Sequence, residues 1–390
     1  MAGALEAALL EEAIATRRDL HAHPELGFEE QRTAALVAER LRALGYQVHE
    51  RIGQTGVVGV LRAPAVGRTV MLRADMDALP VDEESGAAYA SREPGKMHAC
   101  GHDGHVAILL AAARAIAARR AELAGTLVLC FQPAEEGRGG ARAMLADGLL
   151  ERFGIERAYG LHLFSQLSTG TIGLRPGPFY ASSDSIEIAI EGKGGHGAAP
   201  HLSLDPILVG AEFVCALQKI VSREVDPVEP AVVTIGAFHS GTIHNVIPPR
   251  ASLLGTVRAF DEAVRDAMPE RIERILRAAC ASSGARYTFE YLRRYPVTVN
   301  DPEQARYVRA LAERTFGSES VVESPRHMGA EDFAFYAERV PACFVVVGSG
   351  SSEATRFPHH HPHFDFDEAA LATGIRLMLA LALDAPREAP

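Results

Sequence analysis

The feature that most constrains the fold is an alternation of apolar and helical segments in the first half of the chain. Apolar runs at 69–79 and 125–137 end in acidic residues, and one at 156–164 carries a histidine. A segment of helical composition, residues 106–120, lies between the first two. Strands that alternate with helices form mainly parallel sheets with helices on both faces. We therefore predict an α/β fold with a mainly parallel, mixed sheet.

The pattern changes after residue 183. Four segments now have the character of strands and two have helical spacing, in the order 185–193, 205–223 (helix), 231–238, 251–260, 262–283 (helix) and 286–294. This βαββαβ order is the split ferredoxin-like arrangement. We predict a catalytic domain made of residues 1–183 and 295–390, with a ferredoxin-like α+β domain inserted at 184–294.

Composition excludes several classes of function. The formal net charge is -11 and is spread along the chain, whereas a nucleic-acid-binding protein needs a basic surface. The five cysteines are far apart and odd in number, which fits a reducing compartment. Apolar runs stop short of the ~20 residues of a membrane span. We expect a soluble cytoplasmic protein that binds neither nucleic acid nor membrane.

The segment 97–105, MHACGHDGH, is the first candidate for chemistry. Cys100 and His102 lie in a tight turn before a helix, and a thiolate and an imidazole two residues apart can face one metal ion. The alternative is a buried free cysteine beside a turn that caps the helix. Short Cys/His patterns recur by chance, so this segment alone leaves both interpretations open.

Glu135 and Glu136 form the second candidate, directly after an apolar strand. Two adjacent carboxylates there are costly unless a cation neutralises them. With a metal bound, one carboxylate would be a ligand and its neighbour a general base acting on water. A solvated loop is the alternative.

His162 in an apolar strand and the histidine-rich segment 357–368 complete the set, and Asp75, Asp77 and Asp103 are predicted to lie near them, at strand ends or loops. Taken singly, a packed core histidine and an exposed loop are the alternatives. Together these residues share the strand ends and loops of one predicted domain. A mixed set of N, O and S ligands suits zinc, manganese, cobalt or nickel, and it is too large for one tetrahedral ion.

The segment GKGGHG, residues 192–197, matches the glycine pattern of dinucleotide-binding proteins. Pro200 follows it, the next helix begins only near Asp205, and no acidic residue ends the expected next strand. We therefore reject NAD or FAD binding. His196 remains of interest, because the glycines around it would let the backbone approach another surface.

Over nearly its whole length the chain resembles the aminoacylase/carboxypeptidase superfamily of metallo-amidohydrolases, a di-zinc exopeptidase-like fold. It is most similar to the branch of hippurate hydrolases and indole-3-acetyl-amino-acid hydrolases. The resemblance rests on RRDLHAHPELGFEE, RADMDALP, MHACGHDGH, QPAEEG, GLH, GKGGHGAAPH, HNVIPPRASLLGTVRAF, MGAEDFAFY and HHPHFDFDE.

The resemblance implies a site with two divalent metal ions. Cys100 would bridge them, and the remaining ligands would be His102 and His162 on one ion and Glu136 and a C-terminal histidine on the other. The family pattern has that histidine two residues before a proline, which selects His360 from 359–361. Glu135 would be the general base. Asp77 matches an orienting aspartate, although Asp75 stands where other branches have a metal-binding histidine.

The resemblance also implies that the inserted domain is a lid that forms a homodimer; a tetramer stays open. His196 would reach the partner subunit's site and stabilise the oxyanion. Asn245 and Arg258 would hold the substrate carbonyl and carboxylate. The expected reaction is hydrolysis of N-acyl-L-amino acids to a carboxylic acid and an amino acid. A dipeptidase, a carboxypeptidase, an N-acetyl-diaminopimelate deacetylase and a non-catalytic metal-binding protein are the alternatives.

Overall fold

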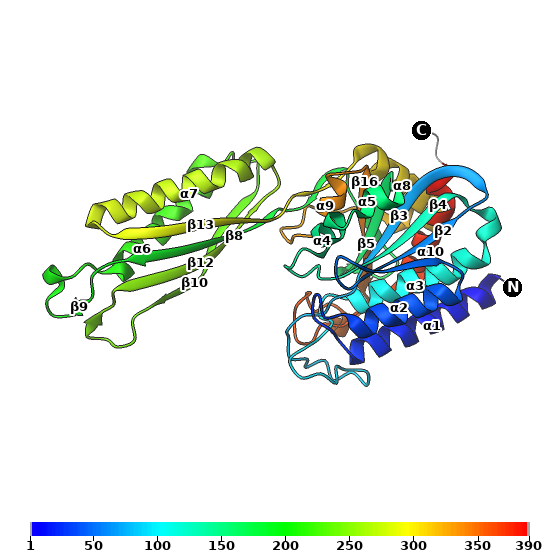
Figure 1. Ribbon diagram of the computed structural model, residues 1–390, viewed down its shortest axis with the longest axis horizontal. Helices are drawn as coiled ribbons and strands as arrows, with labels where there is room; N and C mark the ends of the chain where they lie inside the picture. Colours follow the sequence, from blue (N-terminus) through cyan, green and yellow to red (C-terminus); the bar gives the residue numbers. More distant parts are fainter. Residues whose placement is uncertain (1, 388–390) are drawn as a thin grey trace. The chain divides into compact units, whose positions relative to one another are not determined.

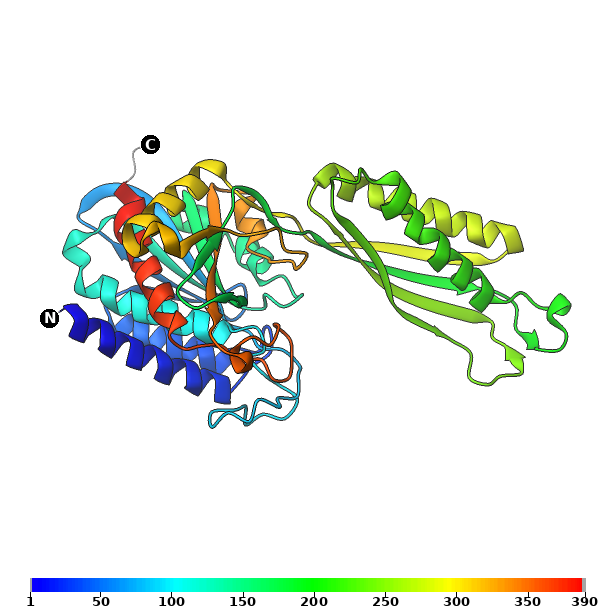
Figure 2. The same ribbon diagram turned by 180° about the vertical axis from the view of Figure 1, so that it is seen from behind.

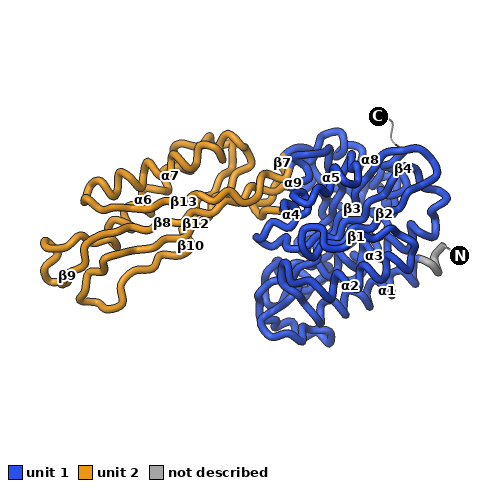
Figure 3. Tube along the Cα trace, viewed as in Figure 1, with its two compact units in different colours: residues 1–177, 299–325, 332–390 blue, residues 178–298, 326–331 orange. Residues whose placement is uncertain are grey.

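The computed structural model describes residues 2–387, which divide into two compact units (Figure 3). Unit 2 spans Pro178–Thr298 and Arg326–Glu331, and unit 1 is the rest of the described chain. Unit 2 is wider than the predicted 184–294, because the segment 326–331 hydrogen bonds to the chain just after residue 178. The amide of His327 donates to Phe179 O (2.9 Å), and that of Ala181 donates to His327 O (2.9 Å).

Unit 1 contains an eight-stranded sheet in the order β1-β2-β4-β3-β5-β16-β6-β15 (Figure 1). The strands are β1 Gln47–Ile52, β2 Gly56–Arg62, β3 Ala65–Asp75, β4 Ala124–Gln132, β5 Arg157–Ser168, β6 Ile172–Leu174, β15 Val321–Glu323 and β16 Ala342–Gly350. β4, β3, β5 and β16 are parallel neighbours, as are β6 and β15, while β1/β2, β2/β4 and β16/β6 are antiparallel. The predicted mainly parallel, mixed sheet is confirmed.

Helices cover both faces of this sheet (Figures 1 and 2). They are α1 Ala2–Ala22, α2 Gln31–Ala43, α3 His102–Ala118, α4 Gly140–Ala146, α5 Leu149–Phe153, α8 Pro302–Phe316, α9 Ala334–Ala337 and α10 Ala370–Asp384. α3 is nearly all buried and packs between α1, α10 and β3. A Cβ at Gly374 of α10 would lie 2.5 Å from Ile108, so the glycine permits this close contact.

The strand order places the candidate residues at one end of the sheet. β3 ends at Asp75, and β4 ends at Gln132, just before the two glutamates. β3 and β5 are parallel with Arg73 opposite Gly160, which brings His162 level with the end of β3. The carboxyl ends of parallel strands are where ligands bind in such sheets.

Unit 2 has a four-stranded antiparallel sheet in the order β10-β12-β8-β13, with two helices packed on one face. Its main elements are β8 Ser183–Glu191, α6 Pro206–Lys219, β10 Ala231–Ser240, β12 Arg250–Ala259, α7 Glu262–Ser283 and β13 Arg286–Tyr295. The chain order is the predicted βαββαβ. Two short strands, β9 Gly195–His196 and β11 Val246–Ile247, pair separately. β7 (Gly177–Tyr180) pairs with β14 (Thr298–Asn300) where the chain passes between the units. Among residues 2–387, no helix is long and apolar enough to span a membrane.

Candidate metal centre

The first group of candidate ligands lies where the chain enters α3. Cys100 Sγ is 3.4 Å from His162 Nε2, and the ligand atoms of Cys100, His102 and His162 lie within 4.8 Å of one another. All three side chains are buried. Gly101 between the first two has a φ of 87°, which glycine adopts without strain. The turn therefore directs residues 100 and 102 to one point, where β5 supplies the third group.

A second group shares the same sulfur atom. His360 Nε2 lies 3.2 Å from Glu136 Oε1, and a ring nitrogen of His360 and a carboxylate oxygen of Glu136 fall within 4.8 Å of Cys100 Sγ. The backbone N–H of His360 donates to Ala99 O (2.8 Å), which ties the C-terminal loop to the turn that carries Cys100. Two ligand groups with one sulfur in common have the arrangement that two adjacent metal ions with a bridging ligand require.

Among the three consecutive histidines, only His360 joins these groups. His359 Nε2 hydrogen bonds to Leu163 O (2.9 Å). The ring of His361 stacks on Phe357 at 4.8 Å, and its Nδ1 accepts from the backbone N–H of residue 363. The left-handed backbone at His360, with a φ of 68°, turns this one side chain away from its neighbours.

Backbone carbonyls orient the two buried imidazoles. His102 Nδ1 donates to Asp77 O (2.9 Å), and His162 Nδ1 donates to Leu163 O (2.6 Å). Each ring therefore presents Nε2 to the site, as neutral ligand histidines do. His102 Nε2 is buried and has no hydrogen-bond partner among the described residues. An orphaned nitrogen beside a thiol and carboxylates fits a divalent cation with a preference for N, S and O ligands.

Without a cation the site retains protons that metal binding would have to release. Burial, and then the charges of Glu136 and Glu135, raise the pKa of the Cys100 thiol well above its usual range. A nearby cation would reverse that effect and stabilise the thiolate. Burial lowers the pKa of His162 well below its ordinary value, which keeps the ring neutral and its lone pair available. Burial also disfavours charged His102, but Asp75 and Asp77 outweigh it and raise its pKa to about 10.

Asp77 holds the turn that carries both glutamates. Its Oδ1 accepts from the backbone N–H of Glu135 (2.9 Å) and its Oδ2 accepts from that of Glu136 (3.0 Å). A carboxylate oxygen of Glu135 lies within 4.8 Å of His102 Nε2 or Nδ1 and of a Glu136 oxygen. The carboxylate of Glu135 is therefore buried beside the ligand groups, and the carboxylate of Glu136 belongs to one of these groups.

Comparison with known proteins agrees with this geometry. The model of peptidase family M20/M25/M40 matches residues 71–384. The chain belongs to this family. A putative amidohydrolase, YhaA of Bacillus subtilis, is 42% identical over 375 residues, which cover 96% of this chain and 94% of that protein. The hippurate hydrolase of Campylobacter jejuni is 40% identical over 368 residues, or 94% of each chain. Bacillus subtilis YXEP, a dinuclear metal binding peptidase of family M20, has a crystal structure with a TM-score of 0.84 and 35% identity, covering 98% of this chain and 99% of that one.

Two further acidic residues near the ligand groups have hydrogen-bond partners of their own, although Asp75 Oδ2 also lies 3.6 Å from His102 Nε2. Asp75 Oδ2 accepts from Arg73 Nη1 (2.6 Å) and its Oδ1 from His105 Nδ1 (2.5 Å). Asp103 Oδ2 accepts from Arg17 Nε (3.0 Å) and pairs with His21 Nδ1 (2.8 Å). Both carboxylates thus already have cationic or imidazole partners, and they support the site from behind.

His105 was not singled out from the sequence. Its Nε2 accepts from the backbone N–H of Leu163 (2.9 Å) while Nδ1 donates to Asp75, so the ring links β3 to the strand that carries His162. It follows His102 by three positions on α3, so the two rings share one face of the helix. This spacing of three positions from His102 is the sequence feature that could have identified His105.

The remaining predicted residues of this M20 chain lie in unit 2. His196 and Asn245 lie together: His196 in β9 pairs with Val246 in β11, and Gly197 N donates to Asn245 O (2.8 Å). Arg258 is near the far end of β12, eight residues from Arg250, or roughly 26 Å along an extended strand. It is half-buried and donates to Thr256 Oγ1 and to Val257 O. Unit 2 therefore presents these groups at opposite ends.

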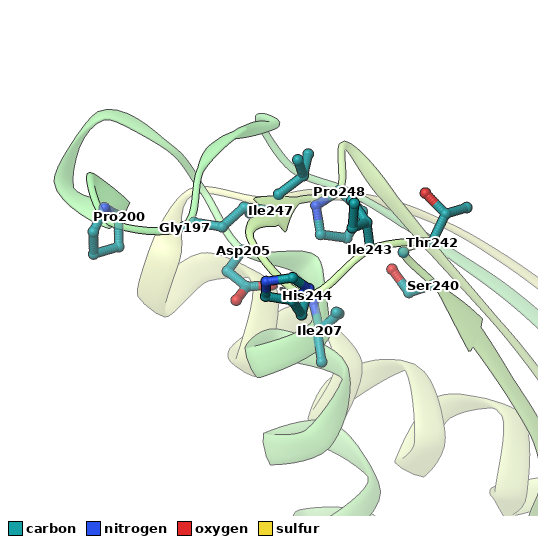
Figure 4. A pocket seen from close by; sticks show the side chains of 12 residues that line it. Gly197, Pro200, Asp205, Ile207, Ser240, Thr242, Ile243, His244, Ile247 and Pro248 are labelled. Carbon is teal, nitrogen blue, oxygen red and sulfur yellow. Dashed lines mark hydrogen bonds between the residues drawn. The ribbon is translucent and has the colours of Figure 1, made fainter.

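A pocket of about 610 Å³ adjoins the loop that carries Asn245 (Figure 4). Its walls combine apolar and polar side chains, among them Ile207, Ile243, Ile247, Asp205 and His244. No feature of the sequence predicted this pocket.

Proposed function

We propose that this M20 chain is an amidohydrolase that cleaves N-acyl-L-amino acids, such as hippurate-like, N-acetyl or other acyl and aryl conjugates. The products are a carboxylic acid and a free amino acid. The observation that carries the proposal is Glu135, a nearly buried carboxylate beside two ligand groups that share Cys100. The similarity to hippurate hydrolase supports the substrate class.

The proposed cofactor is a pair of divalent ions, zinc, manganese, cobalt or nickel. Cys100 would bridge them, with His102 and His162 on one ion and Glu136 and His360 on the other. When bound, the ions would lower the pKa of a water toward about 7 and polarise the amide carbonyl. The carbonyl contacts to both Nδ1 atoms keep the Nε2 lone pairs of the buried histidines directed into the site.

In the proposed reaction, Glu135 accepts a proton from the attacking water and passes it to the leaving nitrogen. Its backbone is held by Asp77, so the carboxylate keeps its place during both transfers. Asp77 would also orient His102, through its carbonyl oxygen. A buried base that is already positioned needs little reorganisation in the transition state.

Unit 2 would supply the remaining groups. We propose that the chain forms a homodimer through this unit, in which His196 stabilises the oxyanion in the partner subunit's site. Asn245, which lies beside His196, would bind the substrate carbonyl in the partner subunit's site, whereas Arg258, at the opposite end of unit 2, would bind the carboxylate of the substrate in its own subunit. The exposed position of His196 on the short strand β9 supports a role outside its own unit. Burial lowers the pKa of Arg258, as is expected of a guanidinium held ready for an anion.

A substrate panel tests the proposal. Hippurate, N-acetyl amino acids, indoleacetyl conjugates, N-acetyl-diaminopimelate and dipeptides are compared at equal concentration with enzyme loaded with Mn²⁺ or Zn²⁺. We expect N-acyl amino acids to give the highest kcat/KM and a chelator to abolish the activity. Glu135→Gln should retain the metal and lose turnover. Near-normal rates in that variant, or a preference for dipeptides, would contradict the proposal.

A further inference from the structure

The loop between β4 and α4, residues 133–139, carries Glu135 and Glu136 in an uncommon backbone shape. Ala134 has a φ of 52°, and Gly137 and Gly139 are also left-handed. A Cβ at Gly140 would lie 1.6 Å from Pro133 O, so the loop folds back tightly on itself. A non-glycine residue in the left-handed region persists where its surroundings hold it. Surrounding groups must therefore hold this loop in place.

Three buried carboxylates from distant parts of the chain hold it. Asp77 accepts from the amides of residues 135 and 136. Glu30 Oε1 accepts from the amide of Ala134 (2.8 Å). Asp332 Oδ2 accepts from the amide of Ala141 (2.9 Å), and its Oδ1 accepts from Gln132 Nε2 (2.7 Å). The contacts begin at the last residue of β4 and end at the second residue of α4, so they enclose the whole loop.

Asp332 also contacts the proposed base directly. Its backbone N–H donates to Glu135 Oε1 (3.3 Å). Arg73 anchors the aspartate from behind: Nη2 donates to Asp332 Oδ1 (3.1 Å) and Nε donates to Gln132 Oε1 (2.9 Å). The side chains of Arg73 and Asp332 are fully buried, which makes the pair rigid and its charges mutually dependent.

We propose that Asp332 and Glu30 are positioning residues of the metal centre: they hold the loop so that Glu135 and Glu136 keep the geometry that base and ligand require. The inference rests on the roles proposed above for these two glutamates. It assigns a role to Asp332 and Glu30, which lie in MGAEDFAFY and RRDLHAHPELGFEE. Neither residue touches the substrate in this proposal; both act through the loop.

Asp332→Asn is the sharper perturbation, because it preserves size and the backbone N–H. An amide has one acceptor oxygen, so its NH₂ group must face either the amide of Ala141 or the side chain of Gln132. Gln132 cannot resolve this by turning over, since its Nε2 would then face Arg73 Nε. We expect metal binding about 10- to 100-fold weaker, and kcat lowered to a similar degree, which is the usual effect of losing a partner of a metal ligand. KM should change little.

The first readout is independent of catalysis: calorimetric titration of the chelator-treated protein with Mn²⁺, and the visible absorption of the Co²⁺-loaded form. Glu30→Ala should weaken Mn²⁺ binding as well, whereas Glu30→Gln, which keeps an oxygen for Ala134, should restore it. Gln304→Ala is the matched control. It removes a buried hydrogen bond from Tyr159 Oη (2.6 Å) in the same unit, away from the loop.

The proposal would be overturned if Asp332→Asn and Glu30→Ala both bound Mn²⁺ as tightly as the wild type does. It would also be overturned if Gln304→Ala weakened Mn²⁺ binding as much as these two variants do. If Asp332→Asn does not fold, the comparison of Glu30→Ala with Glu30→Gln decides the outcome. A wild-type protein that binds Mn²⁺ but cleaves no N-acyl amino acid would refute the proposed function, while the titrations would still judge the positioning role.

Discussion

Replacing Glu30 with glutamine tests the electrostatics of the loop through protein stability. The Glu30 side chain is fully buried, and its Oε2 hydrogen bonds to Thr55 Oγ1 (2.5 Å). Burial raises its pKa to about 7; the hydrogen bond with Thr55 opposes the shift and the charge of Asp77 adds to it. A glutamine has the hydrogen-bonding pattern of the neutral acid: its oxygen can accept from Ala134 and its NH₂ can donate to Thr55.

The sign and size of the effect follow from the shift. The ordinary value is 4.5, so the folded protein binds this proton more tightly than the unfolded chain does between pH 4.5 and 7. Stability therefore falls as pH rises through this window, and the loss is complete above the folded pKa. The rise of the Glu30 pKa from 4.5 to about 7 corresponds to about 3 kcal/mol, at ~1.36 kcal/mol per pKa unit. Glu30→Gln cannot titrate and should escape this loss.

Urea unfolding of metal-free protein at several pH values between 4.5 and 8 measures the difference. Glu30→Gln should gain about 3 kcal/mol relative to wild type across the window, with most of the gain between pH 5 and 7. Glu29→Gln, at a neighbouring side chain that is 54% exposed, should show no such trend. A difference between Glu30→Gln and wild type that is independent of pH would refute the reasoning.

Three further outcomes are expected. Glu135→Gln and His196→Ala should each be inactive alone, but mixed subunits should recover about a quarter of wild-type activity if a symmetric dimer shares its sites; a mixture as inactive as its parents would exclude the shared site. His360→Ala should lose one Mn²⁺ per chain in a metal assay, whereas His361→Ala should keep both; equal losses would refute the choice of ligand. Asp184→Asn should destabilise unit 2 by about 3–5 kcal/mol in urea unfolding, because it leaves the buried Arg265 with only the half-exposed Glu262 as an ion partner. A change below 1 kcal/mol would show that solvent compensates the charge.

Much of the fold was accessible from local patterns. The apolar runs before Asp75 and Glu135 are buried strands, and the period-two segment after residue 184 is β8, at the centre of its sheet. β1 and β2 were not expected. Nearly every residue of β2 is buried, so apolar residues occupy both faces of the strand. Its sequence therefore lacks the alternation of polar and apolar residues that marks a half-buried strand. The connection of 326–331 to unit 2 was also missed, because it depends on pairing between distant segments.

The candidate ligands could be named from the sequence because thiol, imidazole and carboxylate chemistry is carried by residue type. Cys100, His102, Glu135, Glu136 and His162 stand in short, recognisable segments. In the structure, the ligand atoms within each group lie within 4.8 Å of one another, which is close enough for the members of a group to bind one ion; the roles of these residues are proposals.

For Asp77, the sequence offered only a resemblance to an orienting aspartate. The fold shows that its carboxylate accepts hydrogen bonds from the amides of Glu135 and Glu136. Glu30 and Asp332 lie about 100 and 200 positions from the loop that they contact, a separation at which no local pattern operates. The sequence by itself determined the alternation of elements and the chemistry of the candidate ligands, because both follow from residue type and spacing. Only the tertiary structure decided which carboxylates face an amide, an arginine or the metal groups, because burial and long-range packing set each one's partners.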